Sequence, residues 1–168
     1  MSTFEIERKF LWKKAPVDLD SQSHYTIQQA YLTKDPVIRV RHSKDHYTMT
    51  YKGGGMLAHE EYELPLTKSA YETLLAKADG NIITKTRYVW ELPESDINPA
   101  CKALLGDAKL VVECDVFDAP FAPLILAEIE FPSVEAAKAF QMPEYFAEDV
   151  TENPEYHNVN MSFKDLTQ

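Results

Sequence analysis

The chain has 168 residues, of which 45% are hydrophobic and 26% are charged, and its formal net charge at pH 7 is −10. This composition indicates one globular domain over residues 1–168 with a core of its own, and it excludes a disordered chain. The acidic balance argues against nucleic acid and against an anionic membrane as partners, because both repel it at long range.

Strand patterns dominate the chain. Alternation of polar and apolar residues, interrupted by turn residues, predicts eight strands, in chain order at 3–12, 25–32, 36–42, 46–52, 60–66, 83–90, 109–117 and 124–131. Helical spacing predicts helices at 69–78 and after a capping Ser133, and short helices are expected at 98–105 and 143–148. We therefore expect an α+β fold that is mainly antiparallel β.

Charged residues of one sign share a face in six of these strands. Residues two apart on a strand project from the same side. The like-charged pairs are Glu5 and Glu7, Arg39 and Arg41, Glu61 and Glu63, Lys85 and Arg87, Glu113 and Asp115, and Glu128 and Glu130. Lys9 shares the strand face of Glu5 and Glu7, and Lys52 shares the strand face of Thr48 and Thr50. The opposite faces of these strands are apolar.

Two arrangements explain this pattern. Polar faces in water are the usual reason for alternation, but a solvated face gains from mixed charges, whereas these pairs are segregated by sign. Alternatively, the charged faces converge. We expect an eight-stranded antiparallel closed barrel, a tunnel whose interior has room for side chains and one small ligand, with helices packed on its apolar outside. Carboxylates facing Lys and Arg suit a highly charged anion bridged by hard divalent cations.

The motifs also resemble a known family. Residues 5–9, EIERK, look like the ExExK motif of the CYTH, or triphosphate tunnel metalloenzyme, superfamily. Further blocks that resemble it, in order, are 31–32, 38–41, 50–53, 61–63, 84–88, 113–117, 127–131, 148–151 and 156–158. The ordered set is similar to the compact bacterial members, whose N-terminus reads EIERKFL. The resemblance implies an eight-stranded tunnel and metal-dependent attack on a triphosphate.

The resemblance also implies roles for particular residues. The expected phosphate-binding residues are Lys9, Arg39, Arg41, Lys52, Lys85 and Arg87. The expected ligands of a first Mg²⁺ or Mn²⁺ are Glu5, Glu7 and Glu130, with Glu128 nearby. Glu63, together with Glu61, is expected to place a second ion or the attacking water. Catalysis would accordingly rest on Glu5, Glu7, Lys9, Glu63, Lys85, Glu128 and Glu130.

Several single residues have a structural alternative. Glu61, Glu113 and Asp115 are candidates for ion-pair partners that orient an Arg. Arg8 falls on the apolar face and is expected to be a surface or packing residue. Tyr156 fits packing and substrate contact equally well, in a C-terminal segment (Glu148 to Asn158) expected to close one mouth of the tunnel.

The resemblance implies a small triphosphate as substrate, and we expect inorganic triphosphate, cleaved to pyrophosphate and phosphate. Thiamine or nucleoside triphosphates would use the same residues, and a class IV adenylate cyclase, which makes cyclic AMP and pyrophosphate from ATP, needs the same tunnel. A non-catalytic polyphosphate-binding module should have lost its metal ligands, whereas Glu5, Glu7, Glu128 and Glu130 are all present. We therefore expect an enzyme.

The cellular compartment follows from what the chain lacks. No apolar run approaches the ~18 residues of a membrane span, and the start, MSTFEIERKF, lacks the apolar stretch of a signal peptide. Cys101 and Cys114 are too few for a disulfide framework, which agrees with a reducing compartment. We expect a cytoplasmic protein.

Overall fold

The computed structural model describes residues 3–13, 18–53 and 58–166. In that part of the chain, nine strands form one antiparallel sheet. They are β1 (Thr3–Trp12), β2 (Ser23–Lys34), β3 (Val37–Ser43), β4 (His46–Lys52), β5 (Ala58–Leu66), β6 (Ile83–Glu91), β7 (Val111–Phe117), β8 (Ile125–Glu130) and β9 (Phe146–Asp149).

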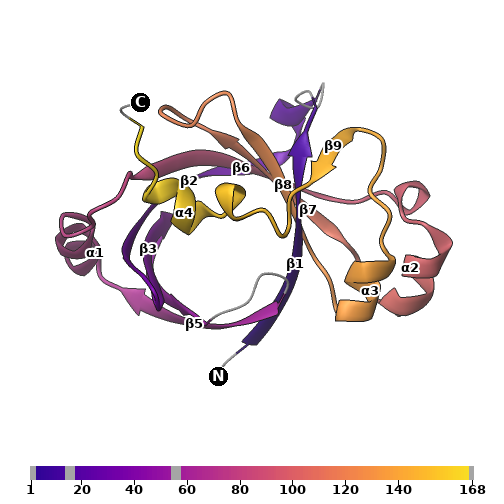
Figure 1. The fold of residues 1–168 in the computed structure, drawn as a ribbon, viewed down its shortest axis with the longest axis horizontal. Helices are drawn as coiled ribbons and strands as arrows, with labels where there is room; N and C mark the ends of the chain where they lie inside the picture. Colours follow the sequence, from indigo (N-terminus) through magenta and orange to yellow (C-terminus); the bar gives the residue numbers. More distant parts are fainter. Residues whose placement is uncertain (1–2, 14–17, 54–57, 167–168) are drawn as a thin grey trace.

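The strand order is β5-β4-β3-β2-β6-β7-β8-β1-β9, and β5 pairs with β1 as well. One edge of β1 pairs with β8 over Glu7 to Leu11. Its start, Thr3 to Ile6, pairs with β5, and its end, Phe10 to Trp12, pairs with β9. The strands consequently curve round a common centre, and both ends of the strand order meet at β1 (Figure 1).

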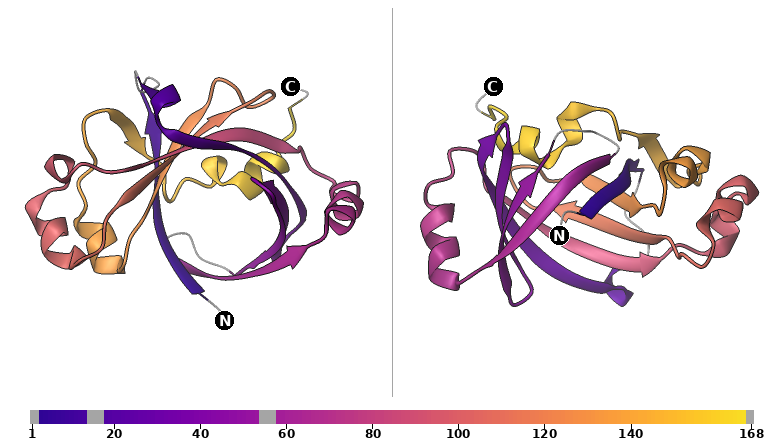
Figure 2. Two further views of the ribbon diagram at one scale, coloured as in Figure 1. Left: turned by 180° about the vertical axis from the view of Figure 1, so that it is seen from behind. Right: turned by 90° about the horizontal axis from the view of Figure 1, so that it is seen from below.

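Three of the four described helices flank the outside of the sheet, and the fourth lies at one mouth of the ring of strands (Figure 1). Helix α1 (Lys68–Leu75), capped by the Thr67 hydroxyl, packs over β2, β3 and β4. On the opposite flank α2 (Pro99–Leu105) packs against α3 (Val134–Ala139), which lies beside β1 (Figure 2). Helix α4 (Asn158–Ser162) lies beside β2 and the 3₁₀ turn Pro154–Tyr156. None of the helices in the described ranges is both long and apolar enough to span a membrane.

Much of the apolar core lies between the outside of the sheet and helices α1, α2 and α3. On one flank Phe10, Val112 and Ile129 pack with residues of α2 and α3 such as Cys101 and Ala136. Under α1, the buried Ala30 and Val40 meet Tyr71. The inner faces are mixed. They carry the charged residues over much of their length, whereas near α4 the inward-facing Ile83, Phe117 and Leu126 form a buried apolar cluster with Met161 of that helix.

The mainly β, antiparallel fold with flanking helices is confirmed, and each of the eight expected strands is present. The helices expected at 69–78, 98–105 and after Ser133 are also present, as α1, α2 and α3, and the Ser133 hydroxyl accepts from the Ala136 N–H. The helix expected at 143–148 is wrong: Phe146–Asp149 is strand β9. It pairs with the end of β1 and supplies backbone partners for Phe10 to Trp12.

Candidate active site

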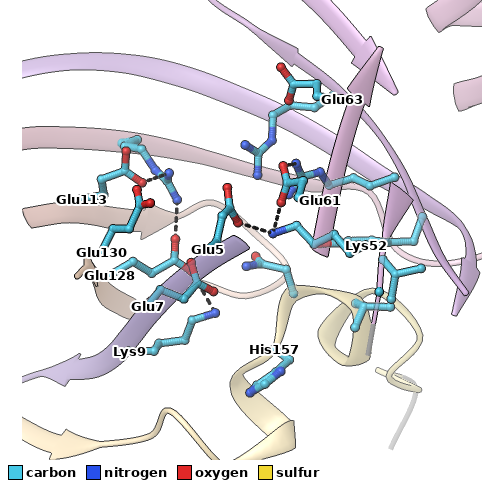
Figure 3. A pocket seen from close by; sticks show the side chains of 18 of the residues that line it. Glu5, Glu7, Lys9, Lys52, Glu61, Glu63, Glu113, Glu128, Glu130 and His157 are labelled. Carbon is cyan, nitrogen blue, oxygen red and sulfur yellow. Dashed lines mark hydrogen bonds and ion pairs between the residues drawn. The ribbon is translucent and has the colours of Figure 1, made fainter. Parts of the chain in front are cut away.

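The inner faces of the strands line a cavity of about 480 Å³ (Figure 3). All five carboxylates expected to bind metal line it, namely Glu5, Glu7, Glu63, Glu128 and Glu130. Five of the six cations expected to bind phosphate line it too, namely Lys9, Arg39, Arg41, Lys52 and Arg87. The charged faces therefore converge, which excludes the alternative that each is a separate solvated face.

One wall of the cavity is mostly acidic. Strands β1 and β8 are antiparallel and place Glu7 opposite Glu130 and Lys9 opposite Glu128. Figure 3 shows Glu5 and these carboxylates on the same side, with Lys52, Glu61 and Glu63 across the cavity. Glu7, Glu128 and Glu130 lie together because β1 and β8 are neighbours in register and every second side chain of each strand points inward.

The opposite wall carries cations of β3 and β4. Arg39 is buried, donates to the Thr50 hydroxyl at 3.0 Å and lies 3.6 Å from the Glu61 carboxylate. Its Nε is buried and has no hydrogen-bond partner among the described residues. A buried N–H of a guanidinium is costly to leave unpaired, so this donor favours an anion in the cavity.

Lys52 links the two walls. Its ammonium lies 2.6 Å from Glu61 and 3.2 Å from Glu5. Glu61 therefore pairs with two cations, Lys52 and Arg39. This agrees with the alternative that Glu61 is an ion-pair partner that orients an Arg, although it also lines the cavity.

Arg87 is the centre of the most extensive ion-pair network. It binds Asp115 through two bonds of 2.7 Å and Glu128 through one of 2.7 Å, and it also pairs with Glu113. Asp115 is buried and does not line the cavity. The carboxylates of Glu113 and Asp115 thus orient Arg87, the alternative stated for both from the sequence.

Electrostatics keep the acidic wall charged where cations are near. Burial alone would raise the pKa of Glu128, but Lys9, at 2.8 Å, and Arg87 hold it well below the usual value. Burial disfavours the Lys9 ammonium, yet Glu128 and Glu7 outweigh burial and raise the pKa of Lys9. Both groups are therefore ionised at neutral pH.

In the described part of the chain, Glu130 has no ion pair with a cation. Burial and then the carboxylates of Glu5, Glu7 and Glu61 raise its pKa. Among the described residues no three acidic, His or Cys side chains converge closely enough to hold a metal ion as they stand. The donor set nevertheless fits one, because Mg²⁺ and Mn²⁺ prefer carboxylate oxygens and a cation would relieve the repulsion between these groups.

Lys85 is the predicted phosphate contact that the structure does not bring to the cavity surface. Its side chain is 0% exposed, pairs with Asp115 and lies 3.5 Å from the Asn158 amide oxygen. Burial, followed by the neighbouring Arg87 and Arg41, lowers the pKa of Lys85 to about 8, although Asp115 raises it. Lys85 lies on the expected face but deeper than the lining residues.

Other assignments are resolved by contacts. Arg8 pairs with Asp149 and donates to the carbonyls of Ala137 and Phe140, so it ties β1 to β9 and α3, as a packing residue does. Tyr156 does not line the cavity; its ring packs against the core beside β2, and its carbonyl accepts from Lys9 at 3.4 Å.

Several lining residues were not predicted as site residues. Tyr25 and Tyr31 come from the inner face of β2, and His157 and Asn158 come from the start of α4. The alternation in β2 was visible, but this strand carries no charged inner residue, so the charge pattern did not single it out. Asn158 belongs to the segment expected near one mouth, and its place in the lining agrees with that.

Known proteins resemble this chain over nearly its whole length. The chain is 37% identical over 158 residues to an inorganic triphosphatase of Nitrosomonas europaea, covering 92% of this chain and 93% of that one. The chain belongs to the inorganic triphosphatase family. A second inorganic triphosphatase, of Acetivibrio thermocellus, is 29% identical over 161 residues, covering 94% and 92% of the two chains.

Solved structures agree with the sequence relatives. The crystal structure of the inorganic triphosphatase NE1496 matches with a TM-score of 0.68 and 32% identity, over 96% of this chain and 95% of that one. A putative adenylate cyclase of Bacillus halodurans, at a TM-score of 0.50 and 14% identity, covers 90% of this chain and 98% of that one and shares the fold alone. No family model matches the chain.

Proposed function

We propose that this member of the family hydrolyses inorganic triphosphate to pyrophosphate and phosphate inside a closed β-tunnel of the CYTH type. The pairing of β5 with β1 supports a closed tunnel, since it joins the first strand of the order to the strand next to its other end. The inorganic triphosphatases of Nitrosomonas europaea and Acetivibrio thermocellus support the substrate.

The single observation that carries the proposal is the division of one cavity into an acidic wall and a cationic wall. Glu7, Glu128 and Glu130 of β1 and β8 line the cavity together with Arg39 and Arg41 of β3, a strand that is separated from β8 by β2, β6 and β7 in the sheet. An anion with several negative charges fits such a cavity only if cations neutralise it on both sides. The cationic wall does so directly, and the acidic wall does so through divalent cations.

Glu5, Glu7 and Glu130 would hold one Mg²⁺ or Mn²⁺, with Glu128 nearby, and Glu63 with Glu61 would hold a second ion or orient water. A bound divalent cation supplies neutralisation of charge on the transferring phosphoryl group. Arg39, Arg41, Lys52, Arg87 and Lys9 bind the phosphate oxygens and hold the chain of phosphates in one orientation for in-line attack by water.

Neighbouring carboxylates hold two of these cations, Lys9 and Arg87, in place. Glu128 keeps Lys9 protonated and directed into the cavity, and Asp115 fixes the plane of the Arg87 guanidinium by its two bonds. Lys85 acts through the same Asp115, since it is buried against that carboxylate. Preorganised donors of this kind stabilise developing charge without reorganising during the reaction.

The cellular setting belongs to the same proposal. We propose a cytoplasmic enzyme with a small-molecule partner; the two cysteines are free and buried, as in a reducing compartment.

The test is a phosphate-release panel with Mg²⁺ and with Mn²⁺. Inorganic triphosphate, thiamine triphosphate, ATP and pyrophosphate are compared at equal concentration, and the ATP sample is also assayed for cyclic AMP. Fastest release from inorganic triphosphate, with none when the metal is chelated, supports the proposal. Cyclic AMP formation, a preference for another substrate, or metal-independent turnover contradicts it.

A further inference from the structure

Gln29 is a buried amide beside the cationic wall. It lies on the inner face of β2, directly opposite Arg41 of β3, and its side chain is 0% exposed. Its Oε1 accepts a hydrogen bond from Arg41 Nε at 3.0 Å, and its Nε2 donates to the Tyr31 hydroxyl at 3.3 Å. Gln29 does not line the cavity, whereas Arg41 and Tyr31 both do.

The orientation of this amide follows from its partners. A guanidinium has only donors, so the amide oxygen must face Arg41. The amide nitrogen then faces Tyr31, whose oxygen must accept, and this leaves the hydroxyl hydrogen of Tyr31 available to another acceptor. One buried side chain therefore fixes the direction of two groups that border the cavity.

Arg41 differs from the other lining cations in its partners. Lys9, Lys52, Arg39 and Arg87 each lie within ion-pair distance of a carboxylate. Within the described ranges Arg41 has no such carboxylate, and Gln29 is its side-chain partner. Burial, then Arg39 and Arg87, lowers the pKa of Arg41 to about 10, so it still carries its charge at neutral pH.

A neutral partner has a different effect from an acidic one. A carboxylate opposite Arg41 would hold the guanidinium equally well, but it would also cancel its charge and add a negative charge near the substrate. An amide oxygen holds the same N–H and leaves the full positive charge facing the cavity.

We propose that Gln29 is a positioning residue that orients Arg41 for the triphosphate while leaving the charge of Arg41 uncompensated. This inference rests on the proposed function and assigns to Gln29 control of substrate affinity. It does not assign Gln29 a contact with substrate.

The test compares Gln29→Glu with Gln29→Met, using inorganic triphosphate. Because an added buried charge next to Arg41 opposes the anion, Gln29→Glu should raise KM about tenfold or more and change kcat less than about threefold. Gln29→Met keeps the volume, leaves Arg41 Nε without its acceptor, and should raise KM by a smaller factor. Thermal unfolding of each variant checks that it folds, and if Gln29→Glu does not fold, Gln29→Met decides.

The chain offers a matched control. Gln28 is the neighbouring amide, on the outer face of the same strand, where it accepts from the Tyr71 hydroxyl at 3.1 Å. Gln28→Glu should leave KM unchanged. In an Arg41→Ala background, Gln29→Glu should lose most of its effect on KM, because the effect passes through that guanidinium.

The outcomes separate this inference from the proposed function. If the wild-type protein releases no phosphate from triphosphate, the proposed function fails, and calorimetric affinity for inorganic triphosphate without metal replaces KM as the measure for Gln29. An unchanged KM and affinity in the folded Gln29 variants overturns the inference. So does an equal change in Gln28→Glu, or an undiminished Gln29→Glu effect without Arg41.

Discussion

Arg87 and Asp115 form a buried bidentate pair, with Arg87 Nε and Nη2 each donating to one carboxylate oxygen at 2.7 Å. The pair joins β6 to β7, where the two residues are opposite each other in register. Because Arg87 also reaches Glu128 of β8, this contact fixes one wall of the cavity across three strands.

Removing the carboxylate of this pair should destabilise the fold. In Asp115→Asn, Arg87 and Lys85 lose a buried counter-charge, and loss of one partner of a buried ion pair costs about 3–5 kcal/mol. Urea unfolding at pH 7 measures the change. Glu113→Gln, whose side chain is 38% exposed and pairs with the same Arg87, should cost about 1 kcal/mol or less. Equal stability of Asp115→Asn and the wild type would show that the pair is not structural.

Removing a carboxylate of the acidic wall should stop turnover without unfolding the chain. Glu130 is exposed to the cavity, so Glu130→Gln keeps the fold but loses a proposed metal ligand, and activity should fall about 10²-fold or more. Phosphate release and Mn²⁺ affinity are measured together. The control is Glu148→Gln, an exposed carboxylate of β9 outside the cavity. Wild-type Mn²⁺ affinity in Glu130→Gln would remove Glu130 from the metal site.

Truncating Arg39 should weaken substrate binding more than it harms the fold. Its unpaired Nε favours an anion, and loss of a charged hydrogen bond is worth about 1.5–3 kcal/mol, so KM of Arg39→Ala should rise roughly 10- to 150-fold. Lys109→Ala, which removes an exposed cation paired with Glu91 on the surface, is the matched control. If both variants raise KM alike, the effect comes from net charge and not from the site.

The pair of Arg8 with Asp149 should make stability depend on pH. Burial would raise the pKa of Asp149, but hydrogen bonds from Thr151 and Arg8 lower it. A carboxyl with a lowered folded pKa stabilises the protein above its unfolded pKa of about 3.9, and this contribution disappears as pH falls through the folded value. Asp149→Asn should therefore be less stable than the wild type by about 1 kcal/mol at pH 7, because the side chain is one-third exposed.

The same variant provides the check at acid pH. Guanidinium unfolding of Asp149→Asn and of the wild type is compared at pH 7 and below pH 3. The difference between the two proteins should shrink as pH falls. A difference that stays constant across this range would mean that the ionised form of Asp149 is not what stabilises the contact.

The sequence predicted well which side chains point inward from the strands, but it did not predict which of them reach the surface of the cavity. Alternation placed Glu7, Glu130 and Arg39 inward because the side-chain period of a strand is two, whatever its partners. It placed Lys85 inward too, but only the tilt and stagger of neighbouring strands decide how far along the cavity a residue lies. Lys85 therefore has the expected orientation and lies buried beside Asp115.

The strand β9 and the role of Gln29 show two further limits. Phe146–Asp149 has four residues, three of them exposed, so its pattern carries no clear period, and it is a strand because the end of β1 offers backbone partners. Gln29 is uncharged, and its significance depends on the two side chains that it contacts across the sheet. Both features are set by contacts between distant segments.

The most direct measurement of the central claim is a crystal structure with Mn²⁺ and a triphosphate analogue whose bridging oxygens are replaced by NH groups. We expect the analogue inside the cavity, its terminal oxygens at Arg39 and Arg41, and the manganese anomalous signal beside Glu7 and Glu130. An analogue bound on the outer surface, with the cavity holding only water, would contradict the account.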